Sequence, residues 1–190
     1  MILKRQYRRA FRLLLWIPLL LSISLLAKEP GDCCLETDIK VTEQIELSRS
    51  LETFFINHNS SRVSHQISWI IISQSEAKHL NPLLMTALVL TESGGHIKAL
   101  GSHGERGLTQ ISKIWWGKFP DCGKNLWNPK TNICYGASVL NVYITQRGGI
   151  KEGINSYNGG GIQVPEYVAK IHRILGIVYL TLYEYPQGEK

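Results

Sequence analysis

One segment of this 190-residue chain constrains the fold more than any other: an apolar run over positions 82–91 that is bounded on both sides. Asn81 precedes Pro82, the usual pairing of an N-cap residue with proline at the first helical position. Gly94 and Gly95 follow the run and are typical of a helix end. Because the predicted helix is apolar on nearly all sides, we expect it to be the buried central helix of an α-helical domain.

The carboxylate of Glu92 comes directly after this apolar run. One interpretation is a solvated residue at the end of a helix. The other is an acid in an apolar pocket, where desolvation disfavours the charged form and raises the pKa. A carboxylic acid that stays protonated near neutral pH is what cleavage of a glycosidic bond requires. Two further blocks, at positions 107–111 and 156–160, favour this second interpretation.

Three blocks occur in order along the chain: Glu92-Ser93, then Gly107-Leu108-Thr109-Gln110, then Ser156-Tyr157-Asn158-Gly159-Gly160. Together they resemble the soluble lytic transglycosylases, a family with a lysozyme-like fold. A later Tyr167-Val168 is similar to the closing segment of that family, and the resemblance covers residues 66–175. Thr109 stands where the family has Met, in a motif of the substrate groove, and Ser156 stands where it has Ala.

The resemblance implies a mostly α, lysozyme-like single catalytic domain after an N-terminal signal or anchor segment. It implies cleavage of the β-1,4 bond between N-acetylmuramic acid and N-acetylglucosamine in peptidoglycan, with a 1,6-anhydro product and no cofactor. Glu92 is then the single general acid and base, because the substrate's own C6 hydroxyl replaces water as the nucleophile. Glycan strands are the expected partner. The residues expected to contact them are Ser93, Gln110, Tyr157, Asn158 and Tyr167.

Alternatives remain open from the sequence. Most glycosidases use two carboxylates, and Glu105 is the nearest second candidate, although a solvated loop charge is the simpler interpretation. A hydrolytic lysozyme of the same fold would use water in place of the C6 hydroxyl. A non-catalytic wall-binding component of an envelope-spanning secretion or conjugation apparatus is the alternative from a different class. Trp115, Trp116 and Trp127 are candidates for stacking on sugar rings, with at least one expected in the core.

The formal charge of +6 comes mainly from the start of the chain. Five basic residues lie between Lys4 and Arg12, and no acid precedes Glu29. Residues 28–190 carry 16 basic and 15 acidic side chains, a balance that gives no electrostatic footprint for nucleic acid.

Residues 13–27 form an apolar stretch after these basic residues. Its length favours a signal peptide, since about 20 residues are needed to span a bilayer. Ala27 suits the cleavage site, but Leu25 is large where a small residue is preferred, so an uncleaved anchor in the cytoplasmic membrane remains open. The protein is thus expected to be periplasmic or exported. The expected organisation is a signal or anchor over 1–27, a spacer or appended segment over 28–64 and the transglycosylase domain over 65–190.

Four cysteines follow this leader, an even number in a chain expected to be exported. Cys122 and Cys134 flank a short turn-rich stretch and are predicted to form a disulfide, whereas the adjacent Cys33 and Cys34 have no evident partner. The cysteine spacing fits no zinc pattern, and His96 near Glu92 lacks a third ligand, so no metal site is expected.

Apolar periodicity predicts further helices over 64–78, 108–118, 130–147, 150–157 and 165–175. Residues 28–64 suggest one short helix outside the catalytic core. The pattern over 176–185 does not distinguish helix from strand.

Overall fold

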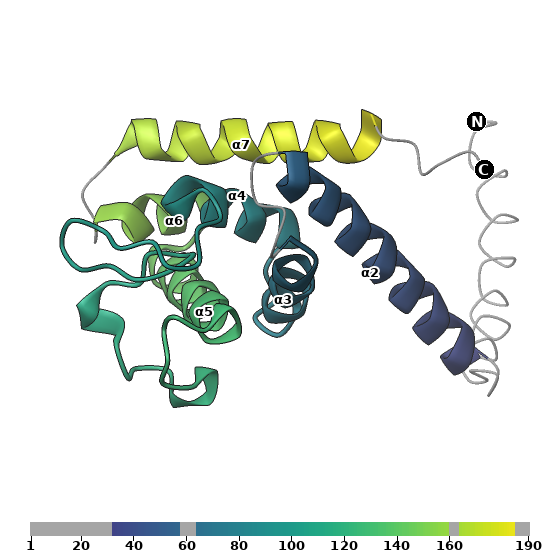
Figure 1. Ribbon diagram of the computed structural model, residues 1–190, viewed down its shortest axis with the longest axis horizontal. Coiled ribbons are helices and arrows are strands. Elements are labelled where there is room, and N and C mark those ends of the chain that lie inside the picture. Colours follow the sequence, from purple (N-terminus) through teal and green to yellow (C-terminus); the bar gives the residue numbers. More distant parts are fainter. Residues whose placement is uncertain (1–31, 58–63, 160–163, 185–190) are drawn as a thin grey trace, which may run out of the picture. The chain divides into compact units, whose positions relative to one another are not determined.

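The computed structural model describes residues 32–57, 64–159 and 164–184, and these residues are mostly helical (Figure 1). The leader, including residues 13–27, lies outside the described residues. The elements are α2 (Asp32–Asn57), α3 (Ser64–Glu76), α4 (Pro82–Ser93), the short 3₁₀ helices η1 (Lys113–Trp115) and η2 (Pro120–Cys122), α5 (Pro129–Arg147), α6 (Ile150–Gly159) and α7 (Pro165–Glu184).

The chain divides into two compact units, residues 1–42 and residues 43–190. Of the first unit, the structure describes only residues 32–42, which form the start of α2. No helix among the described residues is sufficiently long and apolar to cross a membrane. All contacts described below lie within residues 43–190.

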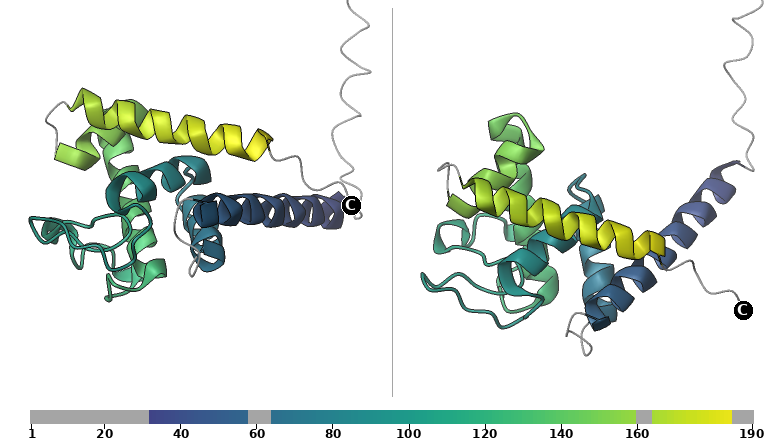
Figure 2. Two further views of the ribbon diagram at one scale, coloured as in Figure 1. Left: turned by 45° about the horizontal axis from the view of Figure 1, so that its top comes forward. Right: turned by 90° about the horizontal axis from the view of Figure 1, so that it is seen from above.

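The predicted helix over 82–92 is confirmed as α4, the central element of the second unit. Asn81 caps it, with Oδ1 accepting a hydrogen bond of 2.7 Å from the Leu83 N–H, and Gly94 ends it with a φ of 60°. The core side chains Met85 and Leu88 are fully buried. Helix α4 contacts α3 and α7, and α5 contacts α3 and α6 (Figures 1 and 2). This packing holds the C-terminal end of α4, and with it Glu92, inside the domain.

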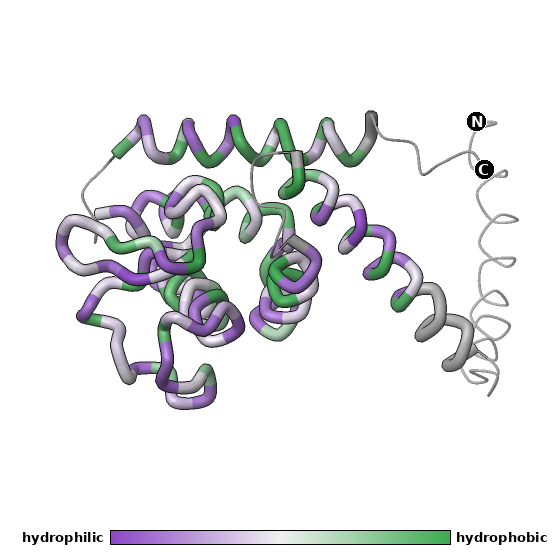
Figure 3. Tube along the Cα trace, viewed as in Figure 1, coloured by the Kyte–Doolittle hydropathy of each residue, from purple (hydrophilic) through white to green (hydrophobic). Residues whose placement is uncertain are grey.

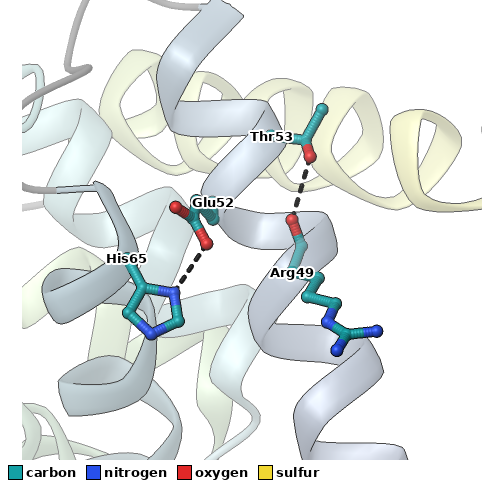
Figure 4. Close-up of polar contacts among 4 residues, drawn as sticks. All are labelled: Arg49, Glu52, Thr53 and His65. Atoms are coloured by element: carbon teal, nitrogen blue, oxygen red, sulfur yellow. Dashed lines mark hydrogen bonds and ion pairs between the residues drawn. The ribbon is translucent and has the colours of Figure 1, made fainter.

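The second half of α2 packs on the core. Phe55 belongs to the main core cluster, while Leu51 and Phe54 pack with Ile72 and Val178. Glu52 of α2 points toward α3, where its carboxylate lies 2.6 Å from the ring nitrogen Nδ1 of His65, as Figure 4 shows. The sequence suggested a short helix outside the core here. The observed helix is longer, and its aromatic side chains Phe54 and Phe55 are buried within the second unit.

Helix α7 continues to Glu184, so the ambiguous pattern from Gly176 is helical as far as the structure describes it. Packing along the whole helix explains its length. Val168 and Ile171 pack in the main core, and Val178 packs with Leu51 of α2. Figure 3 shows apolar and polar stretches alternating along α7, as burial of one side requires.

The helix predicted over 108–118 is wrong. Residues 99–128, called the wall from here on, follow an irregular path whose only helices are the short η1 and η2. Gly107 and Gln110 have positive φ values of 78° and 47°, and Arg106 forms isolated antiparallel bridges with Leu100 and Ile111. Left-handed residues interrupt an α-helix, so Leu108 and Ile111 are buried without one.

A disulfide joins Cys122 and Cys134, as the sequence predicts. It connects η2 at the end of the wall to α5, within a small cluster that also contains Ile111, Leu126 and Tyr135. The wall is thereby linked covalently to the helical core.

Candidate active site

Glu92 opens into a cleft of about 470 Å³ between the helical core and the wall. The C-terminal end of α4 supplies Glu92, α5 supplies Tyr143, and α6 supplies Tyr157 and Asn158. The wall supplies the remaining lining residues, which are Gly101, Ser102, His103, Glu105, Gln110, Ser112, Ile114 and Trp115. A cleft that holds two carboxyl groups, Glu92 and Glu105, among aromatic and amide side chains suits a sugar polymer.

Tyr167, in the first turn of α7, donates a short hydrogen bond from its hydroxyl to Oε1 of Glu92. One turn later, Lys170 Nζ donates to the carbonyl of Thr91 at 3.1 Å. Residues three apart lie on one face of a helix. A single face of α7 therefore contacts both the Glu92 side chain and the carbonyl of the preceding residue, Thr91. Tyr167 therefore orients Glu92 from behind the cleft.

Burial raises the pKa of Glu92 from an ordinary 4.5 to about 7. The hydrogen bond from Tyr167 and the positive charge of Lys170 lower the pKa, and the negative charge of Glu105 raises it, but these effects are smaller than desolvation. Near neutral pH, Glu92 is therefore present in both its protonated and its ionised form. That is the property of a general acid that can later act as a base.

Tyr157 lies on α6 at the edge of the cleft. Its hydroxyl donates to the carbonyl of Thr109 at 2.8 Å, which ties α6 to the wall. Burial raises the pKa of Tyr157 well above its usual value, and the nearby Glu92 carboxylate adds to the shift. Tyr157 is neutral, and its hydroxyl hydrogen already has an acceptor.

Two of the predicted contact residues bond to the backbone of the wall. Ser93 Oγ lies 2.8 Å from the carbonyl of Leu108. Gln110 Nε2 donates to the carbonyls of Gly107 and Ala99, at 2.8 and 3.2 Å. Both side chains hold the wall beside Glu92, and Gln110 also lines the cleft.

Asn132 of α5 organises the wall and was not singled out from the sequence. Its Oδ1 accepts a hydrogen bond of 2.8 Å from the Thr109 N–H, and its Nδ2 donates to the carbonyls of Arg106 and Leu126. Thr109 is fully buried, and a Cβ at Gly136 would lie 2.6 Å from its side chain. Thr109 therefore serves the packing between wall and helix, and it does not line the cleft.

The model of one protein family, the transglycosylase SLT domain, matches residues 70–173. That match includes Glu92, the wall and the start of α7, and it spans more than half of the chain. The chain belongs to the transglycosylase SLT domain family. Its mostly α architecture agrees with the lysozyme-like fold that the sequence resemblance implied.

Among solved structures, the chain is similar to the 70 kDa soluble lytic transglycosylase of Escherichia coli, with 19% identity and a TM-score of 0.48. The similarity covers 76% of this chain and 27% of that much longer protein.

Other cleft residues of this SLT domain differ in their contacts with the rest of the protein. Glu105 accepts a hydrogen bond of 3.0 Å from the backbone N–H of His103 and lies against Gly101. Asn158 is exposed at the cleft edge. Tyr143, buried on α5, packs edge-on against Trp115. Its place in the cleft was not predicted, because helical spacing alone does not reveal which face of α5 meets the cleft.

The three tryptophans of the wall separate in the structure. Trp115 lines the cleft and stacks on Phe119. Trp116 and Trp127 instead contact the guanidinium of Arg106. Within the described part of the chain, no group of three or more His, Cys, Asp or Glu side chains is arranged to hold a metal ion.

Proposed function

We propose that this domain is a peptidoglycan lytic transglycosylase in which Glu92 is the single general acid and base. The observation that carries the proposal is the partly buried Glu92 carboxyl group in the cleft, whose pKa of about 7 suits both proton donation and proton acceptance. Membership of the SLT family and the cleft around Glu92 support it further.

In the proposed reaction, Glu92 gives up one proton and regains one within each catalytic cycle. Glu92 gives its proton to the glycosidic oxygen, and the bond from that oxygen to C1 of the N-acetylmuramic acid residue breaks. The C6 hydroxyl of the same sugar then attacks C1 and loses its proton to the Glu92 carboxylate. The products are a free 4-hydroxyl on one strand and a 1,6-anhydro sugar on the other, and Glu92 is protonated again.

We assign Tyr167 to the stabilisation of the carboxylate that exists between these two proton transfers. Its hydroxyl donates to Glu92, and hydrogen bonds to ionised groups are the stronger kind. Asn158 and the free amide oxygen of Gln110 are the proposed contacts to the glycan. Ser93 and Tyr157 act by fixing the wall, since their hydroxyl groups bond to Leu108 and Thr109.

Digestion of purified murein followed by mass spectrometry tests the proposal. We expect products with 1,6-anhydro ends from the parent protein. Glu92→Gln should slow their formation by at least about 10²-fold, because it removes the transferable proton. The variant should still fold and bind glycan. Cleavage by the Gln variant at the parent rate would contradict the role of Glu92.

A hydrolytic lysozyme is the second candidate, and Glu105 is the observation that favours it. Its carboxylate lines the same cleft and is the second acid that a water-activating mechanism would need. Products with reducing ends, lost on Glu105→Gln, would replace the transglycosylase assignment. Binding of murein without any product would favour a scaffolding role in an envelope apparatus.

We further propose that the catalytic unit acts in the periplasm or outside the cell, delivered by residues 1–27 as a signal or anchor. The basic residues from Lys4 to Arg12 and the apolar stretch over 13–27 support export. A fusion of residues 1–40 to a reporter active only in the periplasm should be active. A silent reporter would contradict export without affecting the assignment of Glu92.

A further inference from the structure

The wall of the cleft has a second face. Glu105 and Trp115 line the catalytic cleft, whereas the next residues, Arg106 and Trp116, line a separate cavity of about 220 Å³. Arg106 lies in a bridged, extended segment, where successive side chains point to opposite sides. The wall therefore separates two cavities. The one lined by Arg106 and Trp116, called the rear cavity below, has no role in the proposed reaction.

Arg106 is held in place at this rear cavity. Its guanidinium carbon lies 4.0 Å from the ring centroid of Trp116 and 5.5 Å from that of Trp127. The indole N–H of Trp116 donates to the carbonyl of Ile111 at 3.3 Å, and Asn132 bonds to the Arg106 carbonyl. Stacking on an indole leaves the N–H edge of a guanidinium available, and that edge matches a carboxylate.

The rear cavity also lies in the most basic part of the catalytic unit. Residues 96–130 contain six basic side chains and two acidic ones, whereas the other described residues from 43 onward contain six basic and eight acidic ones. Lys124 lines the cavity beside Arg106. Within the described part of the chain, no ion pair joins either of these cations to a carboxylate.

We propose that this cavity binds a carboxylate of the peptide stems carried by the glycan substrate, with Arg106 and Lys124 as the charged contacts. The inference rests on the proposed function, since murein supplies these peptides. Arg106 and Lys124, neither of which forms an ion pair with any residue that the structure describes, and an aromatic wall fit an anionic group on a short peptide better than they fit a neutral sugar. The site would make the enzyme prefer peptide-bearing strands.

Kinetics on two substrates test this preference. Lys124→Gln should raise KM about threefold to fivefold for peptide-bearing glycan, the range of a partly exposed ion pair, and leave KM unchanged for glycan stripped of peptides. Lys118→Gln is the matched control, because Lys118 is an exposed lysine of the same wall that does not line the cavity. An equal effect of both variants, or an equal effect on both substrates, would overturn the proposal.

A direct binding measurement keeps the test independent of catalysis. In the Glu92→Gln protein, calorimetry should detect binding of a soluble murein stem peptide with free carboxylates but not of its fully amidated form. Arg106→Gln should weaken that binding about tenfold or more, with partial recovery in Arg106→Lys, which keeps the charge. Equal binding of both peptide forms would refute the carboxylate site. If the parent protein cleaves neither glycan but the peptide still binds, only the proposed function fails.

Discussion

Tyr167 and Glu92 are 75 residues apart in sequence and share a hydrogen bond in the structure. The bond joins the first turn of α7 to the last turn of α4. It stabilises the ionised carboxylate, while burial stabilises the protonated acid. The proton affinity of Glu92 results from these opposed influences, and each can be changed separately.

Tyr167→Phe removes the hydrogen bond that lowers the pKa of Glu92. We expect the fall in activity on the alkaline side, near pH 7 in the parent, to move to higher pH, because the acid keeps its proton longer. The maximal rate should decrease, since Glu92 also loses an orienting contact. Rate against pH measures both effects. Tyr157→Phe is the control. The Tyr157 hydroxyl bonds to Thr109 and not to Glu92, so the pH at which this variant loses activity on the alkaline side should equal that of the parent.

Glu105→Gln should move the alkaline fall in activity to lower pH, opposite to the effect of Tyr167→Phe. The negative charge of Glu105 raises the pKa of Glu92, and its removal lets Glu92 ionise at lower pH. Added salt should reduce the difference between parent and variant, because both carboxylates border an open cleft. Glu152→Gln on α6, which lines a different cavity, should leave the profile unchanged. An upward shift in Glu105→Gln would contradict this electrostatic account.

Glu92→Gln should stabilise the fold at alkaline pH. The folded protein holds the Glu92 proton up to about pH 7, whereas the unfolded chain releases it near 4.5. Raising the pH through this window therefore favours the unfolded state, by at most about 3 kcal/mol above pH 7. Urea unfolding at pH 8 and pH 4.5 should show a gain in the free energy of unfolding for the Gln variant at pH 8 and little gain at pH 4.5.

Loss of the Cys122–Cys134 disulfide should destabilise the protein. The bridge spans 12 residues, and a loop of that size corresponds to about 3 kcal/mol in the chain-entropy model. We expect the Cys122→Ser, Cys134→Ser double variant to have a lower Tm and to be cut first by protease within the wall. An unchanged Tm and unchanged protease resistance would mean that the bridge does not constrain the wall.

Local signals account for what the sequence predicted well. Asn81-Pro82 and Gly94 mark the ends of α4, and the apolar run between them indicates burial, so the position of Glu92 follows from a short stretch of sequence. The Cys122–Cys134 pairing follows from their spacing in a chain expected to be exported.

Long-range contacts account for what the sequence did not reveal. The wall over 99–128 depends on Asn132, which bonds to Thr109 from 23 residues away. Its irregular path also requires a left-handed Gln110, a residue type that gives no warning of a positive φ. Likewise, α7 extends to Glu184 because Leu51 of α2 packs on Val178, and no local pattern identifies that partner.

The close approach of Gly136 to Thr109 has a consequence for the history of this sequence. Because a methyl group at position 136 would overlap the Thr109 side chain, Gly136 cannot be enlarged while Thr109 keeps its place. A descendant that enlarges either residue needs a compensating change at the other, or a shift of the wall relative to α5. These two positions should therefore covary among close relatives of this chain, and Thr109 will be found together with glycine on the facing helix.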